Sequence, residues 1–487
     1  MAAPIPNTTF SFPNGGLGIQ PADPSNIVAI VGASSAGTAD TPASIGGRVS
    51  NVVDQFGYGP MPSLAAALIR SGATVIAVKA ASTGGTPTAV TEGPGVGTSN
   101  MTVAGTGFDR YDVIVEVVRG GTAQTDLTCT VKISLDAGRT FSGEYSVPAN
   151  GIVTALAATT GITSLTFSAG TLIAGTTYSF DVPEPTVTAA NVVAALQALK
   201  LSTFSYALIH VAAPFDASDV ATVVAEVGAI VSRKRFCRVI LEALDEVDET
   251  EAEWMATLTE DFVSSASDLM SVGAGYFPIL DAITGTWYPW RSIAWFATIR
   301  AVQVAVHRDL AAVEDGALAP WANAGAAIAG TIPAGKFIHD EDLTPGLNAQ
   351  RFITIRSFPG LPGYYITNPN VMSGPTSDYD LLQFGRVADA CARFTNVYFT
   401  QQLSSDVPLN PVTGKILEAA AKSLEQGNDS ACSSLVAGKS VSALQTQVSR
   451  DDNIIVDREV TVAVLMVPKG YIKSIPISVG FVVSLPG

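Results

Sequence analysis

At 487 residues, the chain is long enough for about three domains, each with its own apolar core. Apolar residues make up 47% of it and charged residues only 14%, against a usual share of about 25%, which indicates that much of the surface is buried against other subunits. The net charge of −16 argues against a nucleic-acid-binding protein, because such a protein needs a basic patch to neutralise phosphates.

No targeting or membrane segment is predicted. The N-terminus has no basic segment followed by an apolar one, and Arg291, Arg300 and His307 interrupt the most apolar stretch, residues 287–310. The four cysteines lie far apart and form no CxxC pair: Cys129, Cys237, Cys391 and Cys432. We expect reduced, buried thiols in a chain that is soluble and cytosolic when made.

Residues 1–26 are rich in Pro, Gly and Asn and predict an extended N-terminal arm. The arm has only a short alternation of side chains, at Thr8, Phe10 and Phe12. It is too poor in apolar residues to pack alone.

A central α/β domain is predicted from residues 27–85 and 186–324. The apolar strand IVAIVG, a helix near Pro62–Ser71 and the apolar strand TVIAVKA follow one another, which is typical of a parallel sheet covered on both faces. The same rhythm resumes after residue 186, with two helices alternating with the strands YALIHVAA and FCRVILEAL. Residues Asp245–Asp261 then predict an acidic helix face, either simply solvated or used to bind a basic partner. An apolar helix is expected to run to about Leu310.

An inserted β-domain is predicted for residues 86–185. Helical periods are absent there, and short strands alternate with turn signals at about eight- to twelve-residue spacing, as in a small sandwich or barrel. We describe it as inserted because the α/β rhythm resumes directly after it.

Residues 336–487 predict a C-terminal α+β domain. The strands FITIRSF and YYITNPNVM precede a long helix, and apolar residues alternate from Val460 to Met466. A second apolar run follows Pro468-Lys469-Gly470, so the two runs predict a half-buried strand pair. A terminal strand either forms the edge of its own sheet or completes the sheet of another chain. The second interpretation assigns five residues to an inter-subunit strand: Ile475, Ile477, Val479, Phe481 and Val483.

No catalytic, metal-binding or cofactor-binding residue is predicted. The turn Gly32–Thr38 follows a strand as a phosphate loop does, but it lacks the lysine that meets the phosphates. His210 lies inside an apolar strand and is interpreted as a core histidine. The cluster His339–Asp342 could bind a cation weakly, although a solvated loop is the preferred interpretation.

The order of small motifs in the first part of the chain resembles a known family. Gly37, Thr41-Pro42, Phe56-Gly57 and Gly72 occur in the order found in contractile tail sheath proteins of phages and related injection machines, with Lys79 where Arg is commoner. The basic turn Arg233–Phe236 before a strand and the C-terminal helix carrying Arg386 are also similar to that family. The inserted block resembles β-domains in one branch of sheath-like phage proteins.

The resemblance implies a structural subunit that contracts without nucleotide. It implies six-fold rings stacked around an inner tube, with the termini woven into neighbouring copies. The implied partners are further copies of the chain, the inner tube protein, and baseplate and tail terminator proteins. The implied location is the phage tail, assembled in the host bacterial cytoplasm. An α/β hydrolase or carbohydrate-active enzyme with a β accessory domain, or a non-contractile shell protein, remains the alternative.

The resemblance also implies that the C-terminal domain faces the tube. On its long helix, Arg386, Asp389 and Arg393 are spaced three and four residues apart and therefore share one helical face. They are the candidate tube contact, with a set of intrahelical salt bridges as the alternative. The segment Ser423–Ser430, expected to be a loop with Glu425 and Asp429, is a second candidate.

Overall fold

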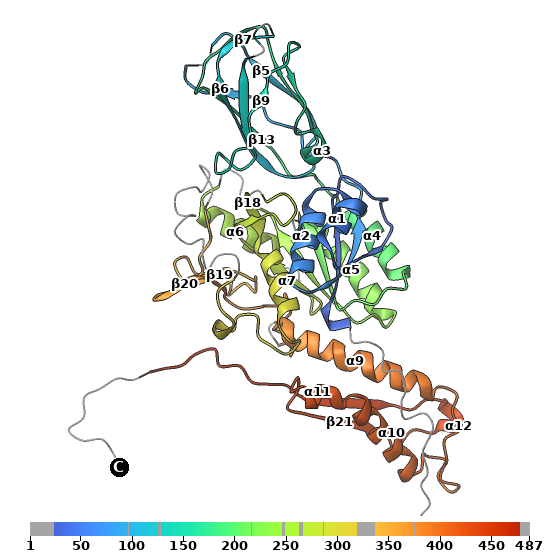
Figure 1. The fold of residues 1–487 in the computed structure, drawn as a ribbon. Helices are drawn as coiled ribbons and strands as arrows, with labels where there is room; N and C mark the ends of the chain where they lie inside the picture. The colour runs from blue at the N-terminus through green and yellow to red at the C-terminus, as the bar shows by residue number, and fades with distance from the viewer. Residues whose placement is uncertain are drawn as a thin grey trace, which may run out of the picture.

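In the computed structural model, the described residues are 24–477 apart from 96, 125, 127, 216, 246–248, 263–265, 286, 319–336 and 375. The predicted arm residues Thr8, Phe10 and Phe12 therefore lie outside the described part of the chain. The chain forms a central α/β body with a β-rich unit at one end and a helical unit at the other (Figure 1).

A six-stranded sheet forms the centre of the molecule, in the order β16-β15-β14-β1-β3-β2. All neighbours pair in parallel except β2 with β3. The strands are β1 (Ile27–Gly32), β2 (Ala43–Ile45), β3 (Thr74–Lys79), β14 (Leu208–Phe215), β15 (Arg238–Ala243) and β16 (Met270–Gly273). The mixed α/β, multi-sheet fold expected from the sequence is confirmed.

Helices cover both faces of this sheet, which explains why its strands are almost continuously apolar. Val28 and Ile30 of β1 belong to a core with α1 (Val49–Phe56), α2 (Pro60–Arg70) and α7 (Ile293–Gln303). Ala29 and Val31 face a second core, which α4 (Ala189–Leu201), α5 (Ala217–Ser232) and α6 (Glu251–Phe262) supply. Helix α7 ends at Gln303, earlier than the predicted Leu310, because the chain turns to an extended conformation at Val304.

The Phe56-Gly57 motif has a clear physical role at the end of α1. Phe56 is buried, and Gly57 ends the helix with a φ of 68°. A Cβ on Gly57 would lie 2.3 Å from Ser35 Oγ, and a Cβ on Gly37 would lie 2.9 Å from the Phe56 ring. The two glycines therefore let the turn after β1 pack directly against the end of α1.

The insertion has a core of its own, made of residues between Met101 and Val182. Three sheets surround that core: β4-β13-β6-β8-β9, β10-β11-β5 and β12-β7. Their strands are β4 (Thr91–Glu92), β5 (Met101–Gly105), β6 (Tyr111–Arg119), β7 (Gly121–Ala123), β8 (Thr130–Ser134), β9 (Tyr145–Ser146), β10 (Ile152–Val153), β11 (Ile162–Phe167), β12 (Gly170–Leu172) and β13 (Thr177–Val182), with the short α3 (Ala157–Thr160).

A buried arginine joins the insertion to the central body. Arg291 lies in β18 (Trp287–Ser292), which pairs with β17 (Tyr276–Leu280). Its Nη2 lies 2.6 Å from both carboxylate oxygens of Asp109, and its Nη1 lies 3.3 Å from Glu184 Oε1. Burial raises the pKa of both carboxyl groups, that of Glu184 to about 8, while the Arg291 charge opposes the rise. The ion cluster therefore ties the insertion, through Asp109 and Glu184, to one hairpin of the central body.

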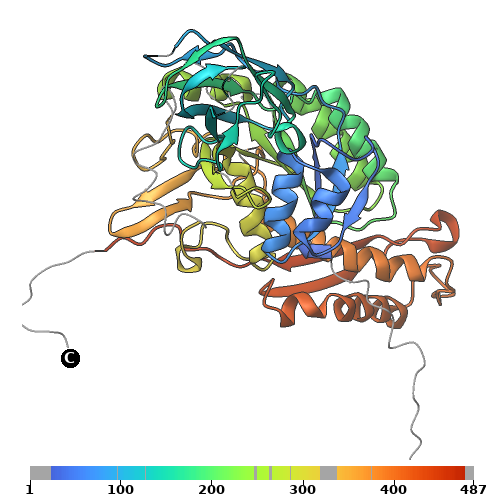
Figure 2. The same ribbon diagram turned by 45° about the horizontal axis from the view of Figure 1, so that its top comes forward.

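The C-terminal part begins with a hairpin of β19 (Ile355–Phe358) and β20 (Leu361–Ile366). Two strands were predicted here, but the second ends at Ile366 rather than at Met372. The long helix α9 (Leu382–Gln402) then runs along the end of the central body opposite the insertion (Figure 1). The remaining elements pack beneath it: α10 (Glu418–Ala431), α11 (Ser433–Ala437), β21 (Ala443–Val448), α12 (Ile454–Asp457) and β22 (Val462–Val467) (Figure 2). All four cysteines are free and buried, as expected.

Candidate assembly interface

The hairpin of β21 and β22 is a two-stranded sheet that covers its apolar residues on one face only. Leu444, Val464 and Met466 pack toward α9 and α11. On the opposite face, Leu465 and Val467 remain 51% and 56% exposed. A two-stranded sheet with an apolar open face is marginal by itself, so this hairpin gains from a further partner.

Helix α10 closes one of the two edges of this hairpin. Asp429 Oδ1 accepts a hydrogen bond from the Thr446 amide at 2.8 Å, and Glu425 Oε1 accepts one from the Val448 amide at 2.9 Å. These carboxylates occupy amides of β21 that a neighbouring strand would need. In the described part of the chain, the other edge, that of β22, carries no further strand. The edge of β22 is therefore the one available for strand addition.

The segment after β22 contacts the central body through Tyr471 and Lys473, while its isoleucines are exposed. The Tyr471 hydroxyl donates to the carbonyl of His307, and Lys473 Nζ lies 2.8 Å from Asn368 Oδ1 and forms an ion pair with Asp309. Ile472, Ile475 and Ile477 are 81%, 70% and 78% exposed. Exposed isoleucines at this density are characteristic of a segment that is buried in an assembly.

The structure corrects the predicted strand pair at the end of the chain. β22 pairs with β21 rather than with the apolar run after Gly470. The two strands are antiparallel, with Ala443 opposite Val467 at one end and Val448 opposite Val462 at the other. Ile475 and Ile477 lie in no strand. Val479, Phe481 and Val483 lie outside the described residues, so their assignment to an inter-subunit strand stays a prediction.

The three residues predicted to contact a tube are occupied within the subunit. Arg386 is 7% exposed and donates to the Ala301 carbonyl at 2.8 Å. Asp389 is 6% exposed and accepts two hydrogen bonds from Arg238 of β15, at 2.9 and 3.0 Å. Arg393 donates to the Phe236 carbonyl at 2.9 Å.

Within the subunit these three side chains are engaged by the central body, and their contact with a tube stays a prediction. The three side chains do share one face of α9, but that face lies against the central body. Burial raises the pKa of Asp389 and the Arg238 charge opposes it, as expected for an ion pair inside a domain junction. The segment Ser423–Ser430 is also not a loop: it lies in α10, where Glu425 pairs with Arg450 and Asp429 binds β21.

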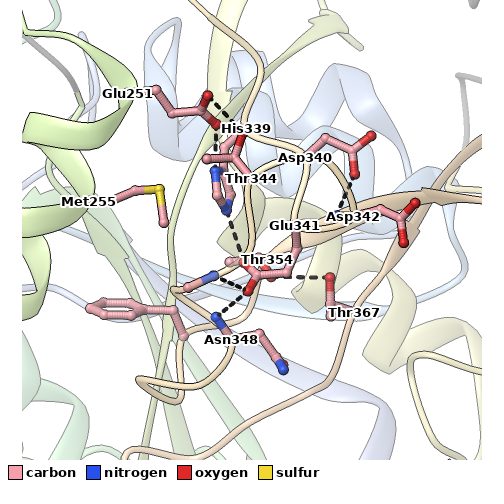
Figure 3. A network of polar contacts seen from close by, with 12 residues as sticks. Glu251, Met255, His339, Asp340, Glu341, Asp342, Thr344, Asn348, Thr354 and Thr367 are labelled. Atoms are coloured by element: carbon pink, nitrogen blue, oxygen red, sulfur yellow. Dashed lines mark hydrogen bonds and ion pairs between the residues drawn. The ribbon is translucent and has the colours of Figure 1, made fainter. Parts of the chain in front are cut away.

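In the cluster His339–Asp342, the first three side chains form a buried network rather than a solvated loop, and Asp342 alone is exposed (Figure 3). His339 is 1% exposed, with Nδ1 lying 2.9 Å from Glu251 Oε1 and Nε2 lying 3.0 Å from Glu341 Oε2. Glu341 also accepts hydrogen bonds from the amides of Gly346 and Asn348. Burial alone would lower the pKa of His339, but the two carboxylates outweigh it and raise the pKa above its ordinary value. The imidazolium therefore joins α6 to the segment that precedes β19.

Replacing His339 by Gln is expected to destabilise the protein most at mildly acidic pH. Because the folded pKa is raised, the contribution of the charged ring is complete below the unfolded pKa of about 6.5 and is lost as pH rises through the folded pKa. We expect a loss of about 1–3 kcal/mol in the free energy of unfolding near pH 5.5, measured by urea titration, and a smaller loss near pH 9. An equal loss at every pH would contradict the charged bridge; His307→Gln is the control, since the pKa of His307 is lowered.

The other candidate chemical groups have structural roles. His210 is fully buried, and its ring nitrogens lie 2.7 Å from Thr298 Oγ1 and 2.9 Å from Glu242 Oε1, which confirms a core histidine. In the described ranges, no group of His, Cys, Asp or Glu side chains is arranged to hold a metal ion. Among the helices described there, none is both long and apolar enough to cross a bilayer.

Two family models match the chain, and they divide it where the central body ends and the helical unit begins. The model described as DUF2586, N-terminal domain, matches residues 5–370, and DUF2586, C-terminal domain, matches residues 378–486. The chain belongs to the DUF2586 family. The boundary between the two matches, residues 371–377, lies just before the start of α9 at Leu382. No curated protein matches the chain.

Solved structures similar to this DUF2586 chain include two sheath tail proteins. The protein from Desulfitobacterium hafniense has 13% identity and a TM-score of 0.46, over 96% of this chain and 100% of that one. The protein from Listeria innocua has 12% identity and a TM-score of 0.43, over 91% and 94%. A chain of the anti-feeding prophage baseplate has 11% identity and a TM-score of 0.41, over 61% and 75%.

Proposed function

We propose that this chain is a structural subunit of a contractile tail sheath, which polymerises as stacked rings around an inner tube and carries no enzymatic activity. The observation that carries the proposal is the exposed apolar segment after Tyr471, next to a hairpin with one open strand edge. A subunit with both a strand to donate and an edge to receive one links to its neighbours in an open series.

Energetics favour the donated strand over an isolated subunit. Burying a fully exposed isoleucine contributes about 1.5–3 kcal/mol, and each added backbone hydrogen bond about 0.5–1.5 kcal/mol net. The exposed Ile472, Ile475 and Ile477 would supply the apolar part, and the edge of β22 the ladder. Every copy has both the segment to donate and the edge of β22 to receive one, so the link can repeat along a polymer.

The rest of the proposal concerns partners and place. Further copies of the chain would be the first partners, and the inner tube, baseplate and tail terminator proteins the others, in the tail of a phage. The chain's low charge content fits a subunit buried on several sides. Contraction would draw on free energy stored at assembly, because links through donated strands can persist while the folded bodies move.

Negative-stain imaging of the purified protein, alone and with the tube protein, tests this function. A sheath subunit should give rings or long tubes, and tube-filled sheaths when the tube protein is present. A discrete small oligomer at all concentrations would contradict the proposal and favour an enzyme. Tubes of one fixed length after acid or denaturant treatment would instead indicate a non-contractile shell.

The insertion, residues 86–185, is expected to fold alone and to be dispensable for assembly. Its core uses only its own residues, and β1 and β3 of the central sheet pair without it. The excised fragment should give a β-rich circular dichroism spectrum with a cooperative thermal transition. A spectrum of an unfolded chain would contradict these boundaries; the chain lacking the insertion should still form tubes.

A further inference from the structure

Two cysteines from different helices lie side by side in the C-terminal unit, where α9 and α10 pack together (Figure 1). Cys391 is in the middle of α9, and Cys432 is the residue at which α10 ends and α11 begins. Both belong to the same apolar cluster, and they are 3% and 0% exposed. The Thr395 hydroxyl lies 3.9 Å from the sulfur of Cys391 and 3.6 Å from that of Cys432, so one side chain contacts both sulfurs.

The two thiols also interact with each other. The hydrogen bond between them raises the pKa of Cys391, and burial adds to the rise. The same hydrogen bond, helped by the Thr395 hydroxyl, lowers the pKa of Cys432 against the opposing effect of burial. Because coupled groups titrate as a pair, the negative charge left by the first proton belongs to both sulfurs. A stabilised thiolate is the form of cysteine that oxidants attack.

The other two cysteines provide a contrast within the same chain. Cys129 and Cys237 are also buried. Burial is the largest effect on each of them, and it raises the pKa of both thiols. They are therefore expected to resist oxidation and to serve as internal controls.

An open pocket of about 450 Å³ leads from the surface to this pair of thiols. Cys391 and Thr395 line it, and Val464 and Met466 of β22 lie on its wall. The volume is ample for a molecule as small as hydrogen peroxide. Since Cys432 is fully buried, an oxidant that enters from solvent meets Cys391 first.

We propose that Cys391 and Cys432 are a site of oxidative modification, at which a small peroxide converts the two thiols into a disulfide bond between α9 and the junction of α10 with α11. The structure holds both residues in the reduced form. The oxidant is a peroxide such as hydrogen peroxide, which supplies the two-electron acceptor. This inference concerns the single subunit and does not depend on the proposed sheath function.

The reaction balances in two steps. The sulfur of Cys391 attacks one peroxide oxygen, the O–O bond breaks, and the leaving hydroxide takes the thiol proton and becomes water, which leaves a sulfenic acid. The sulfur of Cys432 then attacks the sulfur of that sulfenic acid, the S–O bond breaks, and the second hydroxide leaves as water with the Cys432 proton. The two thiols are oxidised to one disulfide, and the peroxide is reduced to two molecules of water.

The disulfide would fix the hairpin of β21 and β22 relative to the central body. Helix α9 packs against that body through Arg386 and Asp389. Helix α10 holds one edge of the hairpin through Glu425 and Asp429. A covalent bond between α9 and the end of α10 joins these two contacts and closes the loop between residues 391 and 432, which restricts the unfolded chain.

Peptide mapping of the oxidised full-length chain tests the assignment. Folded protein is treated with a few equivalents of hydrogen peroxide, the peroxide is removed, and the chain is unfolded in iodoacetamide without reductant and digested with trypsin. Fragments 387–393 and 423–439 should appear as one species, two hydrogens lighter than their sum, while Cys129 and Cys237 are alkylated. Alkylation of all four cysteines, or sulfinic acid on Cys391 without the link, would overturn the proposal.

Thermal unfolding gives a second, independent readout. Peroxide should raise the melting temperature of the wild-type chain by about 5 °C, because the bond closes a loop, and a reductant should reverse the rise. Cys432→Ser should show no such rise, whereas Cys237→Ser, the matched control, should behave as wild type because Cys237 is a buried thiol outside the pair. An equal rise in Cys432→Ser, or a wild-type rise that the reductant does not reverse, would overturn the disulfide.

Discussion

Removal of Ile475–Gly487 should abolish the assembly of tubes and leave a folded subunit. The described part of this segment, Ile475 to Ile477, lies in no strand, and both isoleucines are largely exposed, so the loss of these three residues exposes no core. The proposed strand donation needs the same residues. Imaging and sedimentation should find only unassembled protein, while circular dichroism and the thermal transition remain those of the full chain.

Point variants make this test sharper. Replacing Ile475 and Ile477 together by Asp keeps the length of the segment and removes only its apolar character. Ile173→Asp, in the turn between β12 and β13 of the insertion, is the control, because Ile173 is also an exposed isoleucine, at 48%. Tubes of normal length from the double variant would show that the segment is not a donated strand.

The Arg291→Met variant should lose about 3–5 kcal/mol of unfolding free energy, because it leaves Asp109 buried without its partner. The pKa of Asp109 should then rise further, so the folded state binds a proton more readily and the loss should be smaller at pH 5 than at pH 8. Urea titration at both values measures this. Arg119→Met is the control: its ion pair with Glu144 is exposed and should contribute about 1 kcal/mol or less.

A double substitution separates the contribution of the ion pair from that of the packing of Arg291. Replacing both Arg291 and Asp109 by apolar residues removes the buried charge together with its partner, so much of the stability should return. If the double variant is as unstable as Arg291→Met, packing of the arginine against Trp295, 4.7 Å from the ring centroid, would be the larger contribution.

Local sequence patterns predicted the central sheet well and the terminal strands poorly. β1 and β3 are almost continuously apolar because each strand contributes side chains to a core on both faces of the sheet, and that requirement is visible in the sequence alone. The alternation from Val460 to Met466 correctly indicated a strand with one covered face. It could not identify the partner strand, because β21 has the mixed sequence ALQTQV. The other edge of β21 is covered by Asp429 and Glu425, which accept hydrogen bonds from its amides and lie on a helix that the sequence did not reveal.

The candidate site shows the same limit for charged residues. The spacing of Arg386, Asp389 and Arg393 correctly placed them on one face of a helix, but spacing does not say whether that face meets solvent or another element. Asp389 is buried because Arg238, 151 positions earlier, provides a matching fork. Likewise, His339–Asp342 reads as a polar loop until Glu251 of α6 is placed beside it.

The anchors at Tyr471 and Lys473 determine where tension would enter the subunit. A pull on the segment beyond Ile475 reaches the contacts with His307 and Asp309, just past the end of α7, before it reaches β22. The load then passes to the central body, which has the largest cores of the chain, and the ladder between β21 and β22 is spared. A stretched connection between copies would thus first break the side-chain contacts of Tyr471 and Lys473 and lengthen, before the hydrogen bonds of the receiving hairpin begin to break.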